Sequence, residues 1–404
     1  MVEEIDRVWH GGKEVNKEHA KSEQVFPDEW RHARFGDVAT LQRGFDLPVQ
    51  DRTPGLSPVI GSNGIVGYHN EPKIPGPGVV IGRSGTIGKS FYTEREYWPL
   101  NTGLYVKDFH GNDPLFIHFF FQVFDFGKYS AGVSVPTLNR NLVHEAPVYI
   151  PPLFEQRAIA AVLSKIQAAV EVQDKVVAKL KELKAATMAK LFREGLRGEP
   201  LKQTKIGEVP ESWKLVELGD IAKIGNGSTP NRSNEMYWKN GTIPWITSTK
   251  VHETIIREAN EFVTNMAKKE CHLPLVPKGS IVVAITGQGK TLGNAAIVAF
   301  DTCVNQHLAY ATFHDPNVLP EFVLLYLQTQ YQNLRQASRG GGTTKGALTC
   351  GYLEKYPIPV PRIHEQREIL HIIFPLHRKL EVAESRKSTF KTLFTSMLHL
   401  LMAG

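Results

Sequence analysis

Apolar and polar positions follow two different periods along this chain, and each period occurs twice. Short β-branched runs bounded by glycine or proline, such as residues 78–82 and 280–285, predict buried strands. Residues 114–126 and 320–331 each predict one amphipathic or buried helix. Regions 30–150 and 213–360 are therefore predicted to fold as mixed α/β (α+β) domains.

After each of these regions the apolar positions recur at alternating steps of four and three, which is a heptad seam. In the first seam the apolar positions are Ile159, Leu163, Ile166, Val170, Val177, Leu180 and Leu191, and Gln173, Lys184 and Thr187 are polar. Adding 210 to each number gives Ile369, Ile373, Leu376, Leu380, Ala383, Phe390, Phe394, Met397 and Leu401, with Lys387 polar. Two long helices are predicted.

The apolar stripe of such a helix needs a partner, since residues 156–193 alone would span roughly 55–60 Å. Packing of the two helices against each other predicts an intramolecular coiled coil that separates two domains with pseudo-two-fold symmetry. The alternative is that each helix folds back on its own domain. Pro375 removes a backbone donor and is expected to kink or restart the second helix.

The whole chain is an internal repeat. Pro27 and Trp30 recur as Pro210 and Trp213, an offset of 183, whereas Glu155 recurs as Glu365, an offset of 210. The pair Gly88-Lys89 matches Gly289-Lys290 at an offset of 201, so 18 of the 27 extra residues of the second copy fall between Ala222 and Gly289. Equivalent scaffolds with unlike early regions suit a two-part binder, but drift of surface loops after duplication explains them equally well.

These patterns divide the chain into five segments. They are an N-terminal extension (1–26), a first domain (27–151), a central helix (152–198), a second domain (199–361) and a C-terminal helix (362–404). The extension has no assigned role.

Composition places the chain among ordinary globular proteins. Hydrophobic residues make up 42% and charged residues 22%, and 47 Lys and Arg against 41 Asp and Glu give a net charge of +6. This mild excess leans toward a polyanionic partner. The first ten residues carry no apolar signal run and no stretch is long enough to span a bilayer, so we expect a cytoplasmic protein without membrane contact. Three widely spaced cysteines predict neither disulfides nor a zinc site.

Motifs for catalysis are missing. Gly88-Lys89-Ser90 and Gly289-Lys290-Thr291 lack the glycine that a P-loop places five residues earlier, since Arg83 and Ala284 occupy those positions. Each pair instead predicts a tight hairpin whose lysine and amides could meet a phosphate. We also find no nucleophile elbow, zinc motif or dinucleotide-binding loop. No catalytic residue, metal or cofactor is expected in this chain.

Several runs, in this order and duplicated, carry a family resemblance. They are Leu41-Gln42-Arg43-Gly44-Phe45-Asp46-Leu47-Pro48 and residues 58–68 in the first copy, Gly225-Asn226-Gly227-Ser228-Thr229-Pro230 and residues 237–246 in the second, and the proline-rich lead into Glu-Gln-Arg before each long helix. The chain resembles the specificity (S) subunit of type I restriction-modification systems from about residue 26 to its C-terminus.

The resemblance implies a non-catalytic host-defence subunit with two target recognition domains, held apart by antiparallel helices, that reads a split double-stranded DNA target with a fixed gap. It also implies two methyltransferase subunits that use S-adenosylmethionine on adenine N6, and translocating restriction subunits that use ATP and Mg²⁺, on the prokaryotic nucleoid. Three alternatives stay open: a fused restriction-methylation system outside type I, a scaffold without DNA contact, and a self-contained DNA-modifying enzyme.

Candidate DNA contacts are polar, basic or aromatic residues near the glycine-rich loops, because Lys and Arg bind phosphates while Arg, Asn and Gln can read base edges. For the first half-site they are Arg43, Phe45, Ser62, Asn63, Tyr68, Arg83, Lys89 and Arg140. For the second they are Asn226, Ser228, Asn231, Arg232, Ser248, Lys250, Gln288, Lys290, Arg339 and Lys345.

Overall fold

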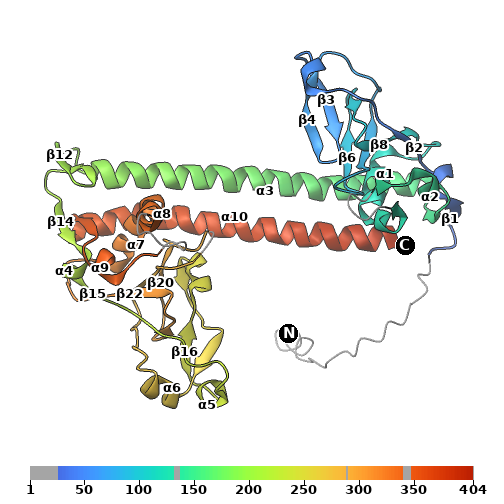
Figure 1. Cartoon of the computed structure of the whole chain (residues 1–404). Coiled ribbons are helices and arrows are strands. Elements are labelled where there is room, and N and C mark those ends of the chain that lie inside the picture. The colour runs from blue at the N-terminus through green and yellow to red at the C-terminus, as the bar shows by residue number, and fades with distance from the viewer. Residues whose placement is uncertain (1–25, 132–136, 288–289, 340–346, 404) are drawn as a thin grey trace, which may run out of the picture. The chain divides into compact units, whose positions relative to one another are not determined.

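A computed structural model describes residues 26–131, 137–287, 290–339 and 347–403 (Figure 1). The chain divides into two compact units. Unit 1 comprises Met1–Val172 with Arg386–Gly404, and unit 2 comprises Gln173–Ser385. Both boundaries fall inside the two long helices, so each unit holds one domain and one stretch of each helix. Across the described ranges, no helix is long and apolar enough to cross a membrane.

Unit 1 is built on small sheets, of which the four-stranded one is antiparallel and the three-stranded one is mixed. A four-stranded sheet has the order β2 (Thr40–Arg43), β8 (Gly103–Asp108), β5 (Gly78–Gly82), β6 (Ser90–Thr93). A three-stranded sheet has the order β4 (Gly64–His69), β3 (Ser57–Gly61), β7 (Trp98–Pro99). The remaining elements are β1 (Arg31–Arg34) paired with β11 (Pro147–Ile150), β9 (Ser130–Ala131) paired with β10 (Thr137–Leu138), helices α1 (Pro114–Val123) and α2 (Arg140–His144), and the short turns η1 (Phe35–Asp37), η2 (Val49–Asp51) and η3 (Phe126–Tyr129).

Unit 2 repeats this plan. Its larger sheet has the order β15 (Ala222–Asn226), β22 (Leu308–Phe313), β19 (Ile281–Ala284), β20 (Ala295–Val298), β17 (Ile255–Ile256), and its smaller sheet the order β18 (Glu261–Val263), β16 (Ile243–Ile246), β21 (Cys303–Val304). The other elements are β14 (Lys214–Glu217) paired with β23 (Pro357–Val360), the hairpin β12 (Leu201–Thr204) and β13 (Gly207–Pro210), helices α4 (Leu218–Ile221), α5 (Glu235–Trp238), α6 (Asn265–Glu270), α7 (Pro320–Thr329), α8 (Tyr331–Arg339) and α9 (Cys350–Glu354), and η4 (Ser248–His252).

Strand register defines which residues of the two domains are equivalent. Gln42 and Arg43 pair with Tyr105 and Leu104 as Gly225 and Asn226 pair with Tyr310 and Ala309. The offset is therefore 183 in β2 and β15. In the same way Val80 and Val282 are equivalent, because they pair with Tyr105 and Tyr310. The repeat predicted from the sequence is confirmed as a repeat of topology.

The register corrects one sequence alignment. The amide of Gly88 donates to Gly82 O, and that of Gly293 donates to the equivalent Ala284 O, both at 3.1 Å or less. Gly88 thus matches Gly293 and not Gly289, and both have positive φ, 74° and 85°. The cause is a turn three residues longer before β20, which leaves Asn294 at the position of Lys89. As predicted, Lys89 leads into a strand, β6, and not into a phosphate-binding helix.

Helices α3 (Leu153–Glu194) and α10 (Ile363–Ala403) pack against each other inside each unit (Figure 1). In unit 1, Leu163 of α3 shares a buried cluster with Leu398 of α10. In unit 2, Val177 and Leu180 cluster with Leu380 and Ala383. Residue numbers rise along one helix as they fall along the other, so the pairing is antiparallel. All the predicted apolar seam positions are buried or half-buried, which confirms the heptad seam.

The helices also pack on the domains, as the alternative prediction required. Ile159 and Leu163, near the start of α3, join the core of the first domain together with the end of α10. Leu191 and Phe192, near the end of α3, join the core of the second domain together with Ile369 of α10. Each domain is therefore seated on the start of the helix that follows it and on the end of the other helix.

Pro375 does not restart the second helix. Helix α10 is continuous from Ile363 to Ala403 with this proline inside it. Pro375 and His371, whose carbonyl loses its partner, are both on exposed positions, so water can satisfy that carbonyl. The position on the solvent side explains why the helix tolerates it.

A buried glutamine joins each long helix to its domain. Gln156 accepts the amide of Asp113 (2.9 Å) and donates to Asn112 Oδ1 (2.8 Å) and Pro151 O (2.9 Å). Gln366 accepts the amide of Leu319 (2.8 Å) and donates to the carbonyls of residues 317 (2.8 Å) and 361 (2.9 Å). Both side chains are nearly inaccessible, at 2% and 0% exposure. Each therefore fixes the helix start against the loop that precedes α1 or α7.

The preceding glutamates complete the two junctions. The indole of Trp30 donates to Glu155 Oε1, and that of Trp213 donates to Glu365 Oε2, each at 3.3 Å. Glu365 also accepts the amide of Leu196 at 2.8 Å, just after α3 ends. The Trp and Glu-Gln positions that recur in the sequence are thus in contact in both copies.

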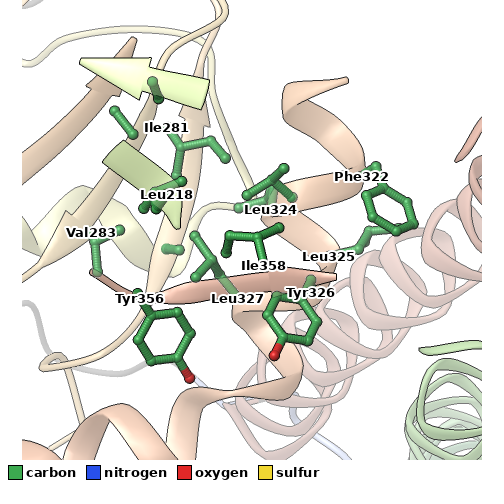
Figure 2. Close-up of a cluster of buried hydrophobic side chains, with 14 of the residues drawn as sticks. Leu218, Ile281, Val283, Phe322, Leu324, Leu325, Tyr326, Leu327, Tyr356 and Ile358 are labelled. Atoms are coloured by element: carbon green, nitrogen blue, oxygen red, sulfur yellow. The ribbon is translucent and has the colours of Figure 1, made fainter. Parts of the chain in front are cut away.

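The core of unit 2 gathers on α7. Leu324 and Leu327 of this helix lie toward Ile281 and Val283 of the sheet and Ile358 of β23, and Phe322 lies on the other side of the helix (Figure 2). The Phe322 and Tyr326 rings lie 5.2 and 5.5 Å from the ring of Phe192 of α3. Pro320 begins the helix, where its missing amide costs nothing. Burial raises the pKa of the Tyr326 and Tyr356 hydroxyls.

A histidine lies in the corresponding core of unit 1. His118 of α1 is 7% exposed, with Nδ1 2.8 Å from Ser90 Oγ and Nε2 3.0 Å from Gln122 Nε2. Burial lowers its pKa to about 4, so the ring is neutral in the folded protein near pH 7.

We predict that Gln156→Leu and Gln366→Leu each lower the free energy of unfolding by about 2–4 kcal/mol, because each leaves several buried polar groups without partners. Urea unfolding followed by circular dichroism measures the loss, with Gln50→Leu at an exposed position as the control. Unchanged midpoints for both variants would contradict the anchoring role.

We also predict that the chain loses stability as the pH falls from about 6.5 toward about 4. The unfolded state binds a proton at His118 first, because the folded pKa is lower. Urea unfolding at pH 7.0, 5.5 and 4.5 should show a smaller pH slope for His118→Gln than for the wild type. The same change at exposed His399 serves as the control; equal slopes for wild type and His118→Gln would refute the assignment.

Candidate nucleic-acid interface

One end of the main sheet of unit 1 carries four polar loops. We call residues 43–46, 62–63, 83–89 and 101–102 the loop end of unit 1. The Arg83 amide donates to Thr102 O (3.0 Å), the Ser62 amide to Thr102 Oγ1 (3.3 Å) and Thr86 Oγ1 to Asn63 Oδ1 (2.6 Å). Asn101 Nδ2 donates to Asp46 Oδ1. These bonds connect all four loops into one surface.

The corresponding loop end of unit 2 comprises residues 226–229, 247–250, 286–287, 290–294 and 305–307. The Ile285 amide donates to His307 O at 3.0 Å, which repeats the bond between Arg83 and Thr102. Thr229 Oγ1 donates to Gln306 Oε1. The His307 ring contacts Thr286 Oγ1 through Nδ1, and its Nε2 lies 3.4 Å from Gln306 Nε2. Polar side chains again join loops from different strands.

A glycine at equivalent positions lets these loops approach. A Cβ on Gly44 would lie 2.2 Å from Leu100 O, and one on Gly227 would lie 1.7 Å from Val304 O. Any larger residue would push residues 43–46 away from residues 101–102, or residues 226–229 away from residues 305–307. The glycine of each repeated run is therefore required to bring residues 46 and 101, and 229 and 306, into contact.

Basic side chains surround the loop end of unit 1. Arg43 and Lys89 are exposed and Arg83 is half-buried. Where the structure describes the chain, none of the three has a carboxylate within ion-pair distance. Arg140 begins α2, two residues after Leu138, whose amide donates to Arg83 O at 2.8 Å. Cations that lack internal partners can neutralise phosphates.

Most of the predicted contacts lie at the two loop ends, and several serve other contacts. Arg43, Phe45, Ser62, Asn63, Arg83 and Lys89 lie at the loop end of unit 1, and Asn226, Ser228, Ser248, Lys250 and Lys290 at that of unit 2. The Phe45 ring stacks on Tyr105, which makes it a packing residue. Tyr68 pairs with Pro58, at the opposite end of the β3–β4 hairpin.

Four predicted residues of unit 2 are engaged within the domain. The Arg232 guanidinium lies over the rings of Trp238 and Trp245, 4.0 and 4.9 Å from their centroids, and pairs with Glu261. Asn231 Oδ1 accepts the Ser233 amide (3.0 Å), as in an ordinary turn. Ser228 Oγ donates to Cys271 O (3.3 Å), and Lys250 pairs with Glu253 (2.9 Å). We assign these four side chains to local packing.

Three predicted residues cannot be placed. Gln288 and Lys345 lie outside the described residues, and Arg339 is described only as the last residue of α8. Conversely, the sequence analysis missed Asp46, Asn101, Thr229, Gln306 and His307. The offset of 183 aligns Asp46 with Thr229, but the match of Asn101 with Gln306 follows only from strand register.

A cleft of about 1000 Å³ opens beside Lys89 in unit 1. Its walls include Phe91 of β6, His118 of α1, and Gln167 and Phe394 of the long helices. Lys89 Nζ lies 5.1 Å from the Phe91 ring centroid. Within the described ranges no three His, Cys, Asp or Glu side chains gather to hold a metal ion.

Comparison with known proteins gives one consistent result. A family model described as "Type I restriction modification DNA specificity domain" matches residues 27–182 and 210–389. The chain is 27% identical over 206 residues to the EcoR124I/EcoR124II type I restriction enzyme specificity subunit of Escherichia coli. This alignment covers 50% of each of the two proteins. The aligned regions cover 64%, 50% and 42% of three curated relatives, less than two thirds of each.

Two solved structures share the fold. The type I restriction-modification S subunit from M. genitalium superposes with a TM-score of 0.68 at 16% identity, over 92% of this chain and 96% of that one. A chain from a structural study of complex assembly and conformational transition of the type I R-M system gives 0.55 at 17% identity, over 94% and 99%.

Proposed function

Because the chain belongs to the type I restriction-modification DNA specificity family, we propose that it reads a split DNA target with a fixed gap, one half-site for each domain. The observation that carries this proposal is the pair of loop ends. They occupy the same position in the same topology and present different side chains, as two readers of unlike sequences require.

Each loop end has the chemistry for this task. Exposed Arg43 and Lys89 in unit 1, and Lys290 in unit 2, can neutralise phosphates, which positions a domain without selecting a sequence. The polar side chains held between the loops can then reach base edges in the major groove, where the four base pairs differ in donors and acceptors.

The chain has a recognition role in this proposal and performs no chemistry itself. Two methyltransferase subunits would supply S-adenosylmethionine and methylate adenine N6, and restriction subunits would supply ATP-driven translocation with Mg²⁺. The proposed place of action is the nucleoid in the cytoplasm of a prokaryotic cell.

The continuous helices α3 and α10 would fix the gap between half-sites, because rigid helices define a distance.

Single-molecule methylation mapping tests the function. DNA from cells that express the chain with its methyltransferase is compared with DNA from cells that express the methyltransferase alone. We expect a split motif with a fixed gap that is methylated only when the chain is present. Identical methylation patterns in the two cell lines would refute DNA specificity and favour a scaffold role.

The two half-sites should also be separable by mutation. Removal of a phosphate contact from one domain, by Arg43→Ala or Lys89→Ala, should weaken binding to DNA that keeps only the first half-site intact. Lys290→Ala should weaken binding only through the second half-site. Each loss should reduce the slope of log Kd against log salt concentration by about one.

Binding of the complex to DNA with one scrambled half-site measures these effects. Lys107→Ala provides a control, since this exposed lysine lies on β8 away from the loop end. A variant that weakened both halves equally would contradict independent reading.

A further inference from the structure

At each loop end, one amide side chain is held by a partner from a different loop. In unit 1 the amide is Asn101, which donates from Nδ2 to Asp46 Oδ1. In unit 2 it is Gln306, which accepts from Thr229 Oγ1. Asp46 and Thr229 both lie three residues after the paired positions Arg43 and Asn226, so the first members of the two pairs are equivalent.

The second members are equivalent by register as well. Val59 and Ile60 pair in parallel with Trp98 and Pro99, as Trp245 and Ile246 pair with Cys303 and Val304. The next amide, Leu100 N, donates to Ile60 O at 2.8 Å, and Asn305 N donates to Ile246 O at 3.1 Å. Asn101 and Gln306 each follow that residue. The same two backbone positions therefore hold a bonded polar pair in both domains.

We propose that the pairs Asp46–Asn101 and Thr229–Gln306 are the specificity-determining residues of the two domains, and that each accepts a hydrogen bond from a base amino group in the major groove. This inference rests on the proposed function and names the base class at each site. The base class follows from the donors and acceptors of each pair that are still free to bind DNA.

The pair in unit 1 presents mainly acceptors. After the bond from Asn101 Nδ2, Asp46 Oδ2 and Asn101 Oδ1 can still accept hydrogen bonds. Asp46 is exposed and, within the described residues, has no ion-pair partner. A carboxylate that faces a phosphate backbone is unfavourable unless a base donates to it. The donors in the major groove are cytosine N4 and adenine N6.

The pair in unit 2 presents a donor beside an acceptor. Gln306 is exposed; one N–H lies toward His307 Nε2, and its Oε1 accepts from Thr229. The second N–H and the second lone pair of Oε1 stay available. The His307 ring is held in turn by Thr286, so the amide has a fixed orientation. A glutamine in this state matches adenine, with Nε2 to N7 and Oε1 to N6.

Binding by the assembled complex of chain and methyltransferase tests the proposal. The probe is the wild-type target, as found by methylation mapping, and a set of duplexes in which each half-site position carries each of the four base pairs. Asp46→Asn exchanges an acceptor for a donor at nearly constant shape. We expect it to reduce discrimination at one position of the first half-site by about fivefold to a hundredfold, with the second half-site unchanged.

Gln306→Glu is the reciprocal change, because it removes the free donor and keeps the acceptor for Thr229. It should reduce adenine preference at one position of the second half-site over the same range and leave the first half-site unchanged. Matched controls are Glu94→Gln, an exposed carboxylate beyond the opposite end of β6, and Gln203→Glu, an exposed amide on β12. Both should retain wild-type discrimination at all positions.

The outcomes separate the two proposals. If the wild-type complex yields no split motif, the proposed function itself fails. If the wild type yields the motif but Asp46→Asn and Gln306→Glu discriminate as the wild type does, the function stands and this assignment is overturned. Loss of discrimination by Gln306→Glu at a position where the wild type requires a G·C pair would also overturn it, because adenine occurs only in A·T pairs. If a variant no longer methylates DNA, the ratios of its binding constants for the different duplexes still test the assignment.

Discussion

The structure depends on a buried glutamine at the start of each long helix. Gln156 and Gln366 use both ends of the amide, accepting from the loop before α1 or α7 and donating to the proline-rich lead before the helix. Such a group is costly to bury unless every polar atom is satisfied. The geometry of helix, lead and domain is consequently fixed together, and neither part can rotate without breaking all of these bonds.

Both copies have the same hydrogen bonds between the glutamine, the preceding loop and the proline-rich lead, so each domain is attached to its long helix in the same way. In unit 2 this attachment is reinforced because Glu365 binds both the Trp213 indole and the Leu196 amide, which connects α10 to the end of α3. Beyond the junction the helices are held by their apolar seam and by contacts with both domain cores. The exposed Pro375 is accommodated because the apolar contacts lie on the other side of the helix.

Differences between the domains are confined to places where the shared register permits them. The offset grows from 186 at Ile60 and Ile246 to 202 at Val80 and Val282, and this stretch of unit 2 contains η4, β17 and α6, which have no counterpart among the described elements of unit 1. At the loop ends the backbone positions are preserved while Asp46 becomes Thr229 and Asn101 becomes Gln306. A common frame thus holds two pairs with different hydrogen-bonding capacity.

The sequence by itself determined the repeat, the mixed α/β domains and the two seam helices, because periodicity and duplication are local properties of the chain. Most of the candidate contacts chosen from the sequence lie at the two loop ends, since glycine-rich turns between strands are visible in the sequence. Only the tertiary structure decided that Arg232 stacks on two indoles, that Gly88 matches Gly293, and that Asn101 and Gln306 meet residues from another loop. The contacts of Asn101 and Gln306 join residues 55 and 77 positions apart, and their partners depend on strand register, which the residue types alone do not specify.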